Sequence, residues 1–256
     1  MPTVESTVVE CRNVKKSWGG VHALAGVSLA VRGAEIVGLA GANGAGKTTL
    51  LNAIGGQTRL NHGEVLFRGR RIDRLSPIAI RRLGLARTFQ ATRILSTRTV
   101  IENVAMSAEY CKPKRRLPPV RFGSSTFSVA REALAFVGLS GVEAAAAGEL
   151  GVYAEKRLML AMALVPEPQI LLLDEPAGGL SPAEVDEMAE LVRGLRERDI
   201  AILLVDHVMS FITQLADRMI VLHDGAVLAE GTSREIVRDA RVRETWLGNP
   251  EPGPAA

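Results

Sequence analysis

Gly41-Ala42-Asn43-Gly44-Ala45-Gly46-Lys47-Thr48-Thr49 is the stretch of this sequence that decides its fold. It matches the phosphate-loop pattern, in which a glycine, four variable residues and a second glycine precede Lys and Thr. The apolar run 36–40 before it predicts a buried strand, and residues 49–54 after it predict a helix that ends at the Gly55-Gly56 pair. A glycine-rich loop between a strand and a helix is the context that the motif requires, so a chance glycine-rich turn is the weaker alternative.

The loop has the residue types that a nucleotide triphosphate needs. Its glycines carry no Cβ, so successive backbone N–H groups can turn inward onto phosphate oxygens, and the following helix adds the partial positive charge of its N-terminus. We expect Lys47 to neutralise charge on the β- and γ-phosphates, Thr48 to give its hydroxyl to Mg²⁺, and Thr49 to donate to an α- or β-phosphate. The predicted ligands of the nucleotide are Gly41, Asn43, Gly44, Ala45, Gly46, Lys47, Thr48 and Thr49.

Composition and charge are those of an ordinary soluble globular protein. The chain has 256 residues, of which 47% are hydrophobic and 23% charged, so it can bury a substantial core. Its longest apolar runs, such as residues 170–173 and 201–205, are much shorter than the about 20 residues that a membrane-spanning helix needs. Residues 1–10 lack the layout of a secretory signal and the 2 cysteines suit a reducing compartment, so we expect a cytosolic protein. A net charge of +3 does not demand nucleic acid as a partner, and we expect none.

The N-terminal part of the chain has the pattern of a small antiparallel sheet. Residues 8–31 alternate between apolar and polar side chains and pause at Gly19-Gly20, which predicts two antiparallel strands. A third extended piece, residues 63–67, would complete a small sheet beside the strand that precedes the loop. Trp18 has two interpretations here: its ring stacks on adenine, or it is a half-buried residue of the sheet.

A helical segment interrupts the strands in the middle of the chain. Residues 100–109 and 130–137 have helical patterns, and no strand signal lies between Gln90 and Val165. We therefore predict a mostly helical subdomain inserted into the α/β core. Gln90 stands at its entrance, at the expected end of a strand, where its side chain either meets Mg²⁺ or the attacking water, or is an ordinary surface residue.

The chain returns to the core with two carboxylates at the end of an apolar run. Residues 170–173 are continuously apolar, which is typical of a strand buried on both faces, and Asp174 and Glu175 follow directly. Ligands of open α/β sheets bind at the carboxyl ends of such strands, so Asp174 is predicted to reach Mg²⁺ through water and Glu175 to act as a general base. The alternative is a pair of solvated acids. His207 follows a second buried strand, residues 201–205, and is either a γ-phosphate contact or a structural histidine.

The remaining elements complete a single α/β domain. Ser181 and Glu184 form a capping box for a helix, residues 218–229 predict a hairpin, and residues 232–235 predict the cap of a last helix. The predicted parts of the domain are residues 1–89, an antiparallel subdomain with the phosphate loop; residues 90–165, the helical subdomain; residues 166–248, the returning core; and residues 249–256, a flexible tail.

The phosphate loop, Gln90, the Asp174-Glu175 pair and His207, in this order, resemble the ATP-binding-cassette (ABC) ATPase family over nearly the whole chain. The resemblance implies the ABC ATPase fold, which is a P-loop NTPase core with a mainly parallel sheet, and ATP and Mg²⁺ as cofactors. It also implies a subunit that lies on the inner face of the cell membrane and works with transmembrane permease subunits. Three segments resemble, more narrowly, the ATPase subunits of branched-chain amino-acid importers: residues 84–90, 174–182 and 242–248.

The resemblance implies roles for residues that the pattern alone left open. Trp18 takes the adenine-stacking position, Gln90 becomes the lid residue that senses Mg²⁺ and the permease, and His207 becomes a switch on the γ-phosphate. The implied catalytic residues are then Glu175, His207 and Gln90, and the implied metal-binding residues are Thr48, Gln90 and Asp174. The family works as a head-to-tail dimer, in which ATP lies between one chain's phosphate loop and the partner's signature segment.

One segment departs from the family pattern. The signature usually reads Leu-Ser-Gly-Gly-Gln or a close variant, and the corresponding residues here are Leu150, Gly151, Val152, Tyr153 and Ala154. The serine hydroxyl and the glutamine amide are absent, and the bulk of Tyr153 is expected to obstruct the approach of the backbone to a γ-phosphate. Since each signature serves the partner's nucleotide, we expect a heterodimer with a second ABC ATPase subunit that has one competent and one impaired site.

The leading functional hypothesis is ATP hydrolysis that drives import of a branched-chain or related hydrophobic amino acid. Another cargo, such as urea, a lipid or a drug, is an alternative, because the permease and its binding protein choose the cargo. A soluble ATPase that acts on nucleic acid or ribosomes is disfavoured, since the sequence has no second cassette, long coiled coil or zinc site. A regulator that rarely hydrolyses ATP is a further hypothesis, which the altered signature favours.

Overall fold

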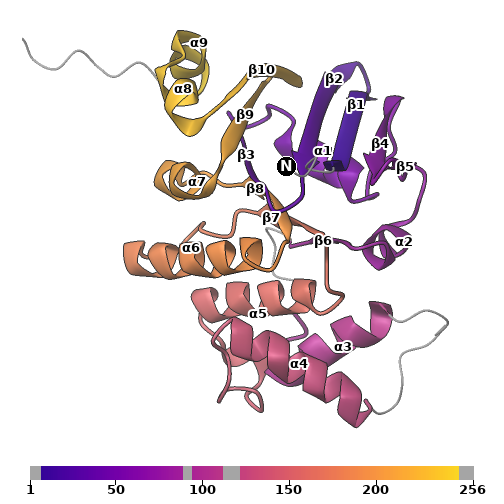
Figure 1. The fold of residues 1–256 in the computed structure, drawn as a ribbon, viewed down its shortest axis with the longest axis vertical. Helices are drawn as coiled ribbons and strands as arrows, with labels where there is room; N and C mark the ends of the chain where they lie inside the picture. Colours follow the sequence, from indigo (N-terminus) through magenta and orange to yellow (C-terminus); the bar gives the residue numbers. More distant parts are fainter. Residues whose placement is uncertain (1–6, 89–93, 112–121, 248–256) are drawn as a thin grey trace, which may run out of the picture.

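Two β-sheets and three groups of helices make up the molecule (Figure 1). The computed structural model describes residues 7–88, 94–111 and 122–247. One sheet has the strand order β2-β1-β4-β5 and the other has the order β10-β9-β3-β8-β7-β6. The strands are β1 (Thr7–Trp18), β2 (Val21–Arg32), β3 (Ile36–Gly41), β4 (His62–Phe67), β5 (Arg70–Arg71), β6 (Leu85–Arg87), β7 (Ile170–Asp174), β8 (Ala201–Val205), β9 (Arg218–His223) and β10 (Ala226–Gly231).

The helices lie between the sheets, beside the larger sheet and in a layer of their own. They are α1 (Lys47–Ile54), α2 (Pro77–Arg82), α3 (Val100–Cys111), α4 (Ser124–Phe136), α5 (Val152–Leu164), α6 (Pro182–Arg196), α7 (Met209–Leu215), α8 (Ser233–Arg238) and α9 (Ala240–Val242). Within residues 7–88, 94–111 and 122–247, no helix combines the length and the apolar character of a membrane-crossing segment.

Each central strand of the larger sheet contributes to two hydrophobic cores. In β7, Leu171 and Leu173 pack into a core shared with the helical layer, whereas Ile170 and Leu172 face a core shared with α1 and the smaller sheet. Because successive side chains of a strand point to opposite faces, a strand covered on both faces must be apolar throughout. The pairs β3–β8, β8–β7 and β7–β6 are parallel, which confirms the mainly parallel sheet expected from the sequence.

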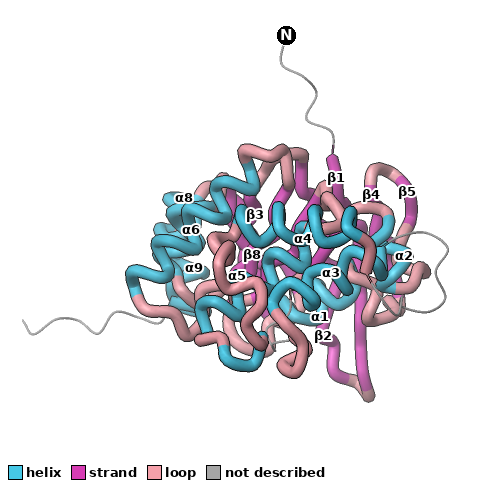
Figure 2. The backbone as a smooth tube through the Cα atoms, turned by 90° about the horizontal axis from the view of Figure 1, so that it is seen from below, coloured by secondary structure: helices cyan, strands magenta, loops and turns pink. Residues whose placement is uncertain are grey.

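The smaller sheet is built on the β1–β2 hairpin. These strands pair antiparallel from Thr7 and Arg32 to Trp18 and Val21, and β4 joins the other edge of β1. The N-terminal end of β1 lies at one end of the molecule, and the tip of the hairpin projects at the opposite end (Figure 2). Leu50, in α1, is fully buried between this sheet and the larger one. The predicted antiparallel sheet is therefore confirmed, and it covers the helix that follows the phosphate loop.

Helices α3, α4 and α5 form the layer at the bottom of Figure 1, and Figure 2 views the molecule from that side. The predicted helix at residues 130–137 is longer than expected, because α4 begins at Ser124 after the N-cap Gly123. Within the described residues 94–111 and 122–165, the only β-type pairing is an isolated bridge of Thr99 with Ala146. This agrees with the expected absence of strands from the middle of the chain.

The C-terminal elements follow the sequence signals closely. The Ser181–Glu184 capping box is present at the start of α6, and a second box joins Thr232 and Glu235 before α8. The hairpin of β9 and β10 adds an antiparallel edge to the larger sheet. The predicted flexible tail, residues 249–256, lies outside the described residues.

Arg218, the first residue of β9, fastens this strand to the start of β3. Its Nε donates to Glu35 Oε1 at 2.7 Å, and the side chains of Arg218 and Glu35 are 18% and 10% exposed. Burial raises the pKa of Glu35. The Arg218 guanidinium and the backbone N–H of Arg32 together lower this pKa by more than burial raises it, so the net shift is downward. A lowered carboxylate pKa stabilises the fold above the ordinary pKa of Glu and loses this effect as the pH falls through the folded-state value.

We expect Arg218→Ala to lower the free energy of unfolding at pH 7 by about 3 kcal/mol, because it leaves Glu35 buried without its partner. The deficit should shrink as the pH falls below about 4, where the carboxylate becomes protonated. Urea denaturation at several pH values measures both effects. The control is Arg241→Ala, which removes an ion pair between Arg241 and Asp239. Because this arginine is 64% exposed, its removal should cost much less stability than that of Arg218. Equal losses in the two variants would refute the role of Arg218.

Candidate functional site

A cavity of about 360 Å³ lies over the loop that joins β3 to α1. The loop follows the carboxyl end of β3, and two further residues reach the cavity from the carboxyl ends of β7 and β8. These are the positions where open α/β sheets bind ligands. The lining residues are Asn43, Gly44, Ala45, Gly46, Lys47, Thr48, Thr49, Glu175 and His207.

Two glycines of the loop are required by its backbone. Gly41 has φ 143°, and a Cβ there would lie 2.2 Å from the carbonyl oxygen of Leu222. Gly46, the N-cap of α1, has φ 103°, and a Cβ there would lie 2.4 Å from the carbonyl oxygen of Ala23. Any larger residue at either position would displace backbone of the surrounding strands. The backbone N–H of Gly225, in the β9–β10 turn, also donates to the Ala45 carbonyl at 3.1 Å, a contact that sequence patterns gave no signal for.

Lys47 is held inside the loop by the loop itself. Its Nζ donates to the carbonyl oxygens of Gly41 and Ala42 at 2.6 and 2.9 Å, and the residue is 7% exposed. Burial lowers the pKa of Lys47, and the negative charges of Glu175 and Asp174 oppose this shift. The ammonium is thus directed across the loop and is placed near Asp174, the last residue of β7, and Glu175, which follows it.

Glu175 and His207 meet at the mouth of the cavity. His207 Nε2 lies 2.7 Å from Glu175 Oε1, and the side chains of the two residues are 50% and 18% exposed. Glu175 adopts the left-handed backbone conformation, with φ 53°, which is strained for a residue with a Cβ. Its N–H donates to the Val205 carbonyl at 2.8 Å, and its own carbonyl accepts from Lys156 Nζ at 2.6 Å. The strained backbone is therefore fixed from two sides, and it directs the carboxylate toward the phosphate loop and His207.

Asp206 organises the loops that carry these two residues, although the sequence analysis gave it no role. Its carboxylate accepts the backbone N–H groups of Ala177 and His207 at 2.7 Å and of Val208 at 2.9 Å, and the residue is 2% exposed. Burial raises the pKa of Asp206, and the three N–H donors oppose this. Asp206 directly follows a buried strand, and this position could have identified it as a site residue from the sequence. The same signal identified Asp174.

Asp174 closes β7 and is buried beside Arg87. Thr48 is exposed at the start of α1. Hard oxygen donors of this kind suit Mg²⁺, which proteins bind through one or two carboxylates together with substrate phosphates. In the part of the chain that the structure describes, no group of three or more His, Cys, Asp or Glu side chains could hold a metal ion by itself. The donor set therefore fits a magnesium ion that arrives with a nucleotide.

Trp18 is a predicted site residue that lies apart from this cluster in the structure. Trp18 ends β1 at the hairpin tip, is 49% exposed and lies with Lys16 Nζ 4.9 Å from its ring centroid. It does not line the cavity, but Ala23 and Leu24, further along the same hairpin, lie against Gly46. Gln90 lies outside the described residues, so its predicted place in the site stays a prediction.

The segment expected to act as the signature leads into α5. Gly151 is the N-cap of the helix, and Val152 is 56% exposed. The Tyr153 ring lies beside the next turn of its own helix, where the Arg157 guanidinium is 4.4 Å from the ring centroid. Burial and a hydrogen bond with Glu187 of α6 raise the pKa of Tyr153 to about 12. Leu150 and Ala154 pack, partly buried, against the hydrophobic core. The Tyr153 side chain therefore has Arg157 of its own helix and Glu187 of α6 as neighbours, and its expected effect on a partner's nucleotide stays a prediction.

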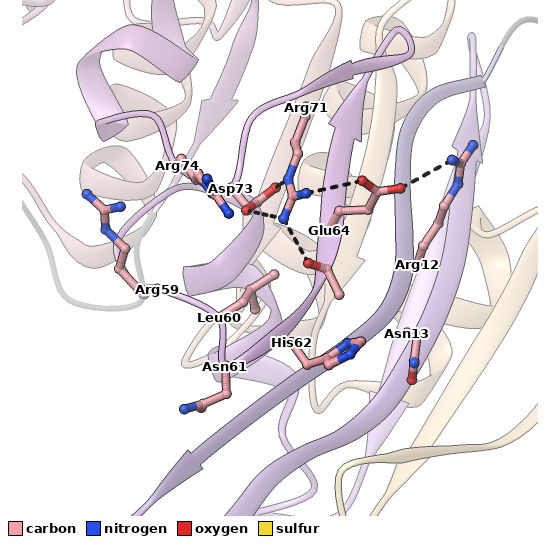
Figure 3. A pocket seen from close by; sticks show the side chains of 11 residues that line it. Arg12, Asn13, Arg59, Leu60, Asn61, His62, Glu64, Arg71, Asp73 and Arg74 are labelled. Atoms are coloured by element: carbon pink, nitrogen blue, oxygen red, sulfur yellow. Dashed lines mark hydrogen bonds and ion pairs between the residues drawn. The ribbon is translucent and has the colours of Figure 1, made fainter.

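A second concave region, of about 590 Å³, lies on the smaller sheet and has different chemistry (Figure 3). Its carboxylates are already paired: Glu64 lies between Arg12 and Arg71, and Asp73 accepts from Arg71 Nε at 2.8 Å. None of the phosphate-loop residues lines it. The chemistry described above therefore belongs to the smaller cavity.

Comparison with known proteins agrees with this geometry. The family model described as ABC transporter matches residues 24–178, which is more than half of the chain. The LivG protein of Salmonella typhimurium, a high-affinity branched-chain amino acid transport ATP-binding protein, is 37% identical over 240 residues, which cover 90% of this chain and 94% of LivG. The chain belongs to the ABC transporter family, as an ATP-binding subunit that couples ATP hydrolysis to transport.

Solved structures show the same fold. An ATP-binding cassette of an ABC transporter in its ADP conformation superposes with a TM-score of 0.85 at 27% identity, covering 94% of this chain and 99% of that chain. A dimeric cassette in a post-hydrolysis state, bound to ADP and phosphate, superposes with a TM-score of 0.78 at 25% identity, covering 88% of this chain and 99% of that chain. As an ABC ATPase subunit, this chain binds ATP and ADP, dimerises and works with permease subunits.

Proposed function

We propose that this chain hydrolyses ATP to drive the import of branched-chain or related hydrophobic amino acids through a membrane permease. The observation that carries hydrolysis is the 2.7 Å contact of Glu175 with His207 beside the phosphate loop. The cargo is supported by the similarity to LivG over 90% of the chain. The subunit itself lies on the inner face of the cell membrane, held there by the permease.

In this proposal the chain's own residues bind the phosphates of ATP and activate the attacking water. Lys47 moves its ammonium from the loop carbonyls to the β- and γ-phosphates, and the loop N–H groups bind the remaining oxygens. Glu175 takes a proton from the attacking water, and His207 orients the Glu175 carboxylate and contacts the γ-phosphate. Thr48 and Asp174 would hold Mg²⁺, which would neutralise phosphate charge when bound. Electrostatic stabilisation and positioning supply most of the catalysis of phosphoryl transfer.

Trp18 and Gln90 complete the site in the same proposal. Ala23 and Leu24, on the hairpin that carries Trp18, lie against Gly46, and the Trp18 ring is exposed; both observations support stacking of this ring on adenine. Stacking of this kind contributes about 1 to 3 kcal/mol. Gln90 follows Arg87, which contacts Asp174, and thus continues a segment attached to the metal-binding acid.

A groove on the helical side suits the permease. It has a volume of about 390 Å³ and lies between α2, α3, α4 and the loop after α5. Its rim includes Val129, 41% exposed, and Tyr110, 51% exposed, is on the neighbouring helix α3. We propose that cytoplasmic loops of the permease dock here and that residues 90–165 move as a unit against residues 1–89 and 166–248 when ATP closes the dimer.

We further propose that the second ATPase subunit of the dimer is a different protein. Two groups that serve a partner's nucleotide are missing at the start of α5, since glycine replaces the serine hydroxyl at Gly151 and alanine replaces the glutamine amide at Ala154. The impairment rests on these two losses, because the Tyr153 ring lies against Arg157 and Glu187. A heterodimer with an intact signature in the partner would leave this chain's own phosphate loop competent.

Turnover of the isolated chain tests the heterodimer. We expect slow hydrolysis without cooperativity in ATP, because both sites of a homodimer would use the altered signature. The double variant Gly151→Ser and Ala154→Gln restores the missing groups and should raise turnover at least about 10-fold, the effect of a charge-assisted hydrogen bond. The control is Val142→Ser, an exposed valine outside the segment. Fast, cooperative hydrolysis by the unmodified chain alone would rule the heterodimer out.

The proposed cargo is tested in vesicles that contain the permease, both ATPase subunits and a solute-binding protein. Addition of the binding protein loaded with leucine should stimulate ATP hydrolysis and move radiolabelled leucine across the vesicle membrane. Stimulation by urea, a lipid or a drug, with none by leucine, would replace the cargo and keep the ATPase. An ATPase that sediments with ribosomes or DNA rather than with permease vesicles would exclude transport.

A further inference from the structure

A buried arginine joins three elements around the phosphate loop. Arg87, the last residue of β6, donates from Nη2 to Asp174 Oδ2 at 2.8 Å and from Nη1 to Asn52 Oδ1 at 2.7 Å. The side chains of Arg87 and Asp174 are each 5% exposed. Asn52 lies in α1, the helix that begins at Lys47. One guanidinium therefore connects the strand that leads to Gln90, the acid at the end of β7 and the helix of the phosphate loop.

The next residue strengthens the same connection. Thr88 donates its N–H to the Leu172 carbonyl at 3.0 Å, and its hydroxyl oxygen accepts the N–H of Asp174 at 3.3 Å. The end of β6 thus holds both the backbone and the side chain of Asp174.

Burial of an ion pair is not by itself a reason for its presence. The desolvation of two charges roughly cancels their attraction, and apolar residues of similar volume often serve a fold equally well. The position of this pair is more informative. Arg87 occupies one oxygen of Asp174 and places a positive charge beside the carboxylate. A cation that approaches Asp174 meets a carboxylate whose charge is already partly offset.

We propose that Arg87 is a positioning residue that weakens and orients the hold of Asp174 on Mg²⁺, so that the metal is retained only together with nucleotide and leaves with the products. The inference rests on the proposed function, in which Asp174 is the acid that Mg²⁺ approaches. It extends that function by connecting the strand before Gln90 to the metal-binding acid through one guanidinium.

The test is the Mg²⁺ dependence of nucleotide binding by the full chain, measured with a fluorescent ATP analogue at equilibrium. Arg87→Met removes the charge and keeps an apolar side chain of similar length, so it should lower the Mg²⁺ concentration for half-maximal binding at least about 10-fold. Arg87→Lys keeps the charge and should stay within about threefold of the unmodified chain. Arg74→Met removes an exposed arginine elsewhere and should leave the Mg²⁺ requirement unchanged.

A second variant keeps the test valid if Arg87→Met does not fold. Asn52→Asp places a competing carboxylate on Arg87 and draws the guanidinium from Asp174, which should lower the Mg²⁺ requirement in the same direction. The inference is overturned if the Mg²⁺ concentration for half-maximal binding is unchanged in Arg87→Met and Asn52→Asp, or in whichever of the two folds. Arg87 would then be a structural residue. Failure of the unmodified chain to bind the analogue at any Mg²⁺ concentration would instead overturn the proposed function.

Discussion

Glu175→Gln is expected to reduce ATP turnover by the assembled transporter about 100- to 1000-fold, because the amide cannot accept a proton from the attacking water. The amide can still form a hydrogen bond with His207, and the backbone contacts with Val205 and Lys156 do not involve the side chain. The variant should therefore fold, bind ATP and retain it unhydrolysed. Steady-state phosphate release and the amount of bound ATP measure the two effects.

The matched control is Glu197→Gln, which alters an exposed carboxylate at the end of α6 and should hydrolyse ATP at the unmodified rate. A Glu175→Gln variant that hydrolyses ATP within about threefold of the unmodified rate would exclude a general base at this position. It would also favour the hypothesis of a regulator whose slow hydrolysis has no part in transport.

Lys47→Ala is expected to weaken ATP binding about 10- to 150-fold, because it removes hydrogen bonds between a charged group and the phosphates that are each worth about 1.5 to 3 kcal/mol. The loop should keep its shape, since the glycine turns at Gly41 and Gly46 remain when the hydrogen bonds of the ammonium to the Gly41 and Ala42 carbonyls are lost. Isothermal titration with ATP measures the affinity.

Lys15→Ala serves as its control, because Lys15 is an exposed residue of β1 that does not line the cavity. Thermal unfolding of the Lys47→Ala variant should stay close to that of the unmodified chain. Unchanged ATP affinity in a folded Lys47→Ala variant would mean that the loop is not the phosphate site.

The elements that carry the site were predictable because each has a local signal. The glycines of the phosphate loop, the apolar runs of β7 and β8 and the cap at Ser181 are set by residues close together in the sequence, and the structure has the corresponding elements. A chance glycine-rich turn was a weak alternative to a phosphate loop for the same reason, since the loop pattern fixes the residue type at several neighbouring positions.

The contacts that organise the site were not predictable in this way. Arg87 and Asp174 are 87 positions apart, and Asp206 and Ala177 are 29 apart, so no periodic pattern connects them. The direction of Tyr153 also depends on a neighbouring helix, because Glu187 of α6 and Arg157 hold its ring. The sequence singled out Lys47, Glu175 and His207, which line one cavity in the structure, but the residues that position them required the fold.

The most direct test of the central claim is a comparison of ATP retention and phosphate release in one reconstituted transporter that carries the unmodified chain, Glu175→Gln or Lys47→Ala. The account predicts that the unmodified chain releases phosphate, that Glu175→Gln retains ATP without release, and that Lys47→Ala does neither at ATP concentrations that saturate the other two. Equal phosphate release from all three transporters would contradict it, because hydrolysis would then depend on neither Lys47 of the phosphate loop nor Glu175.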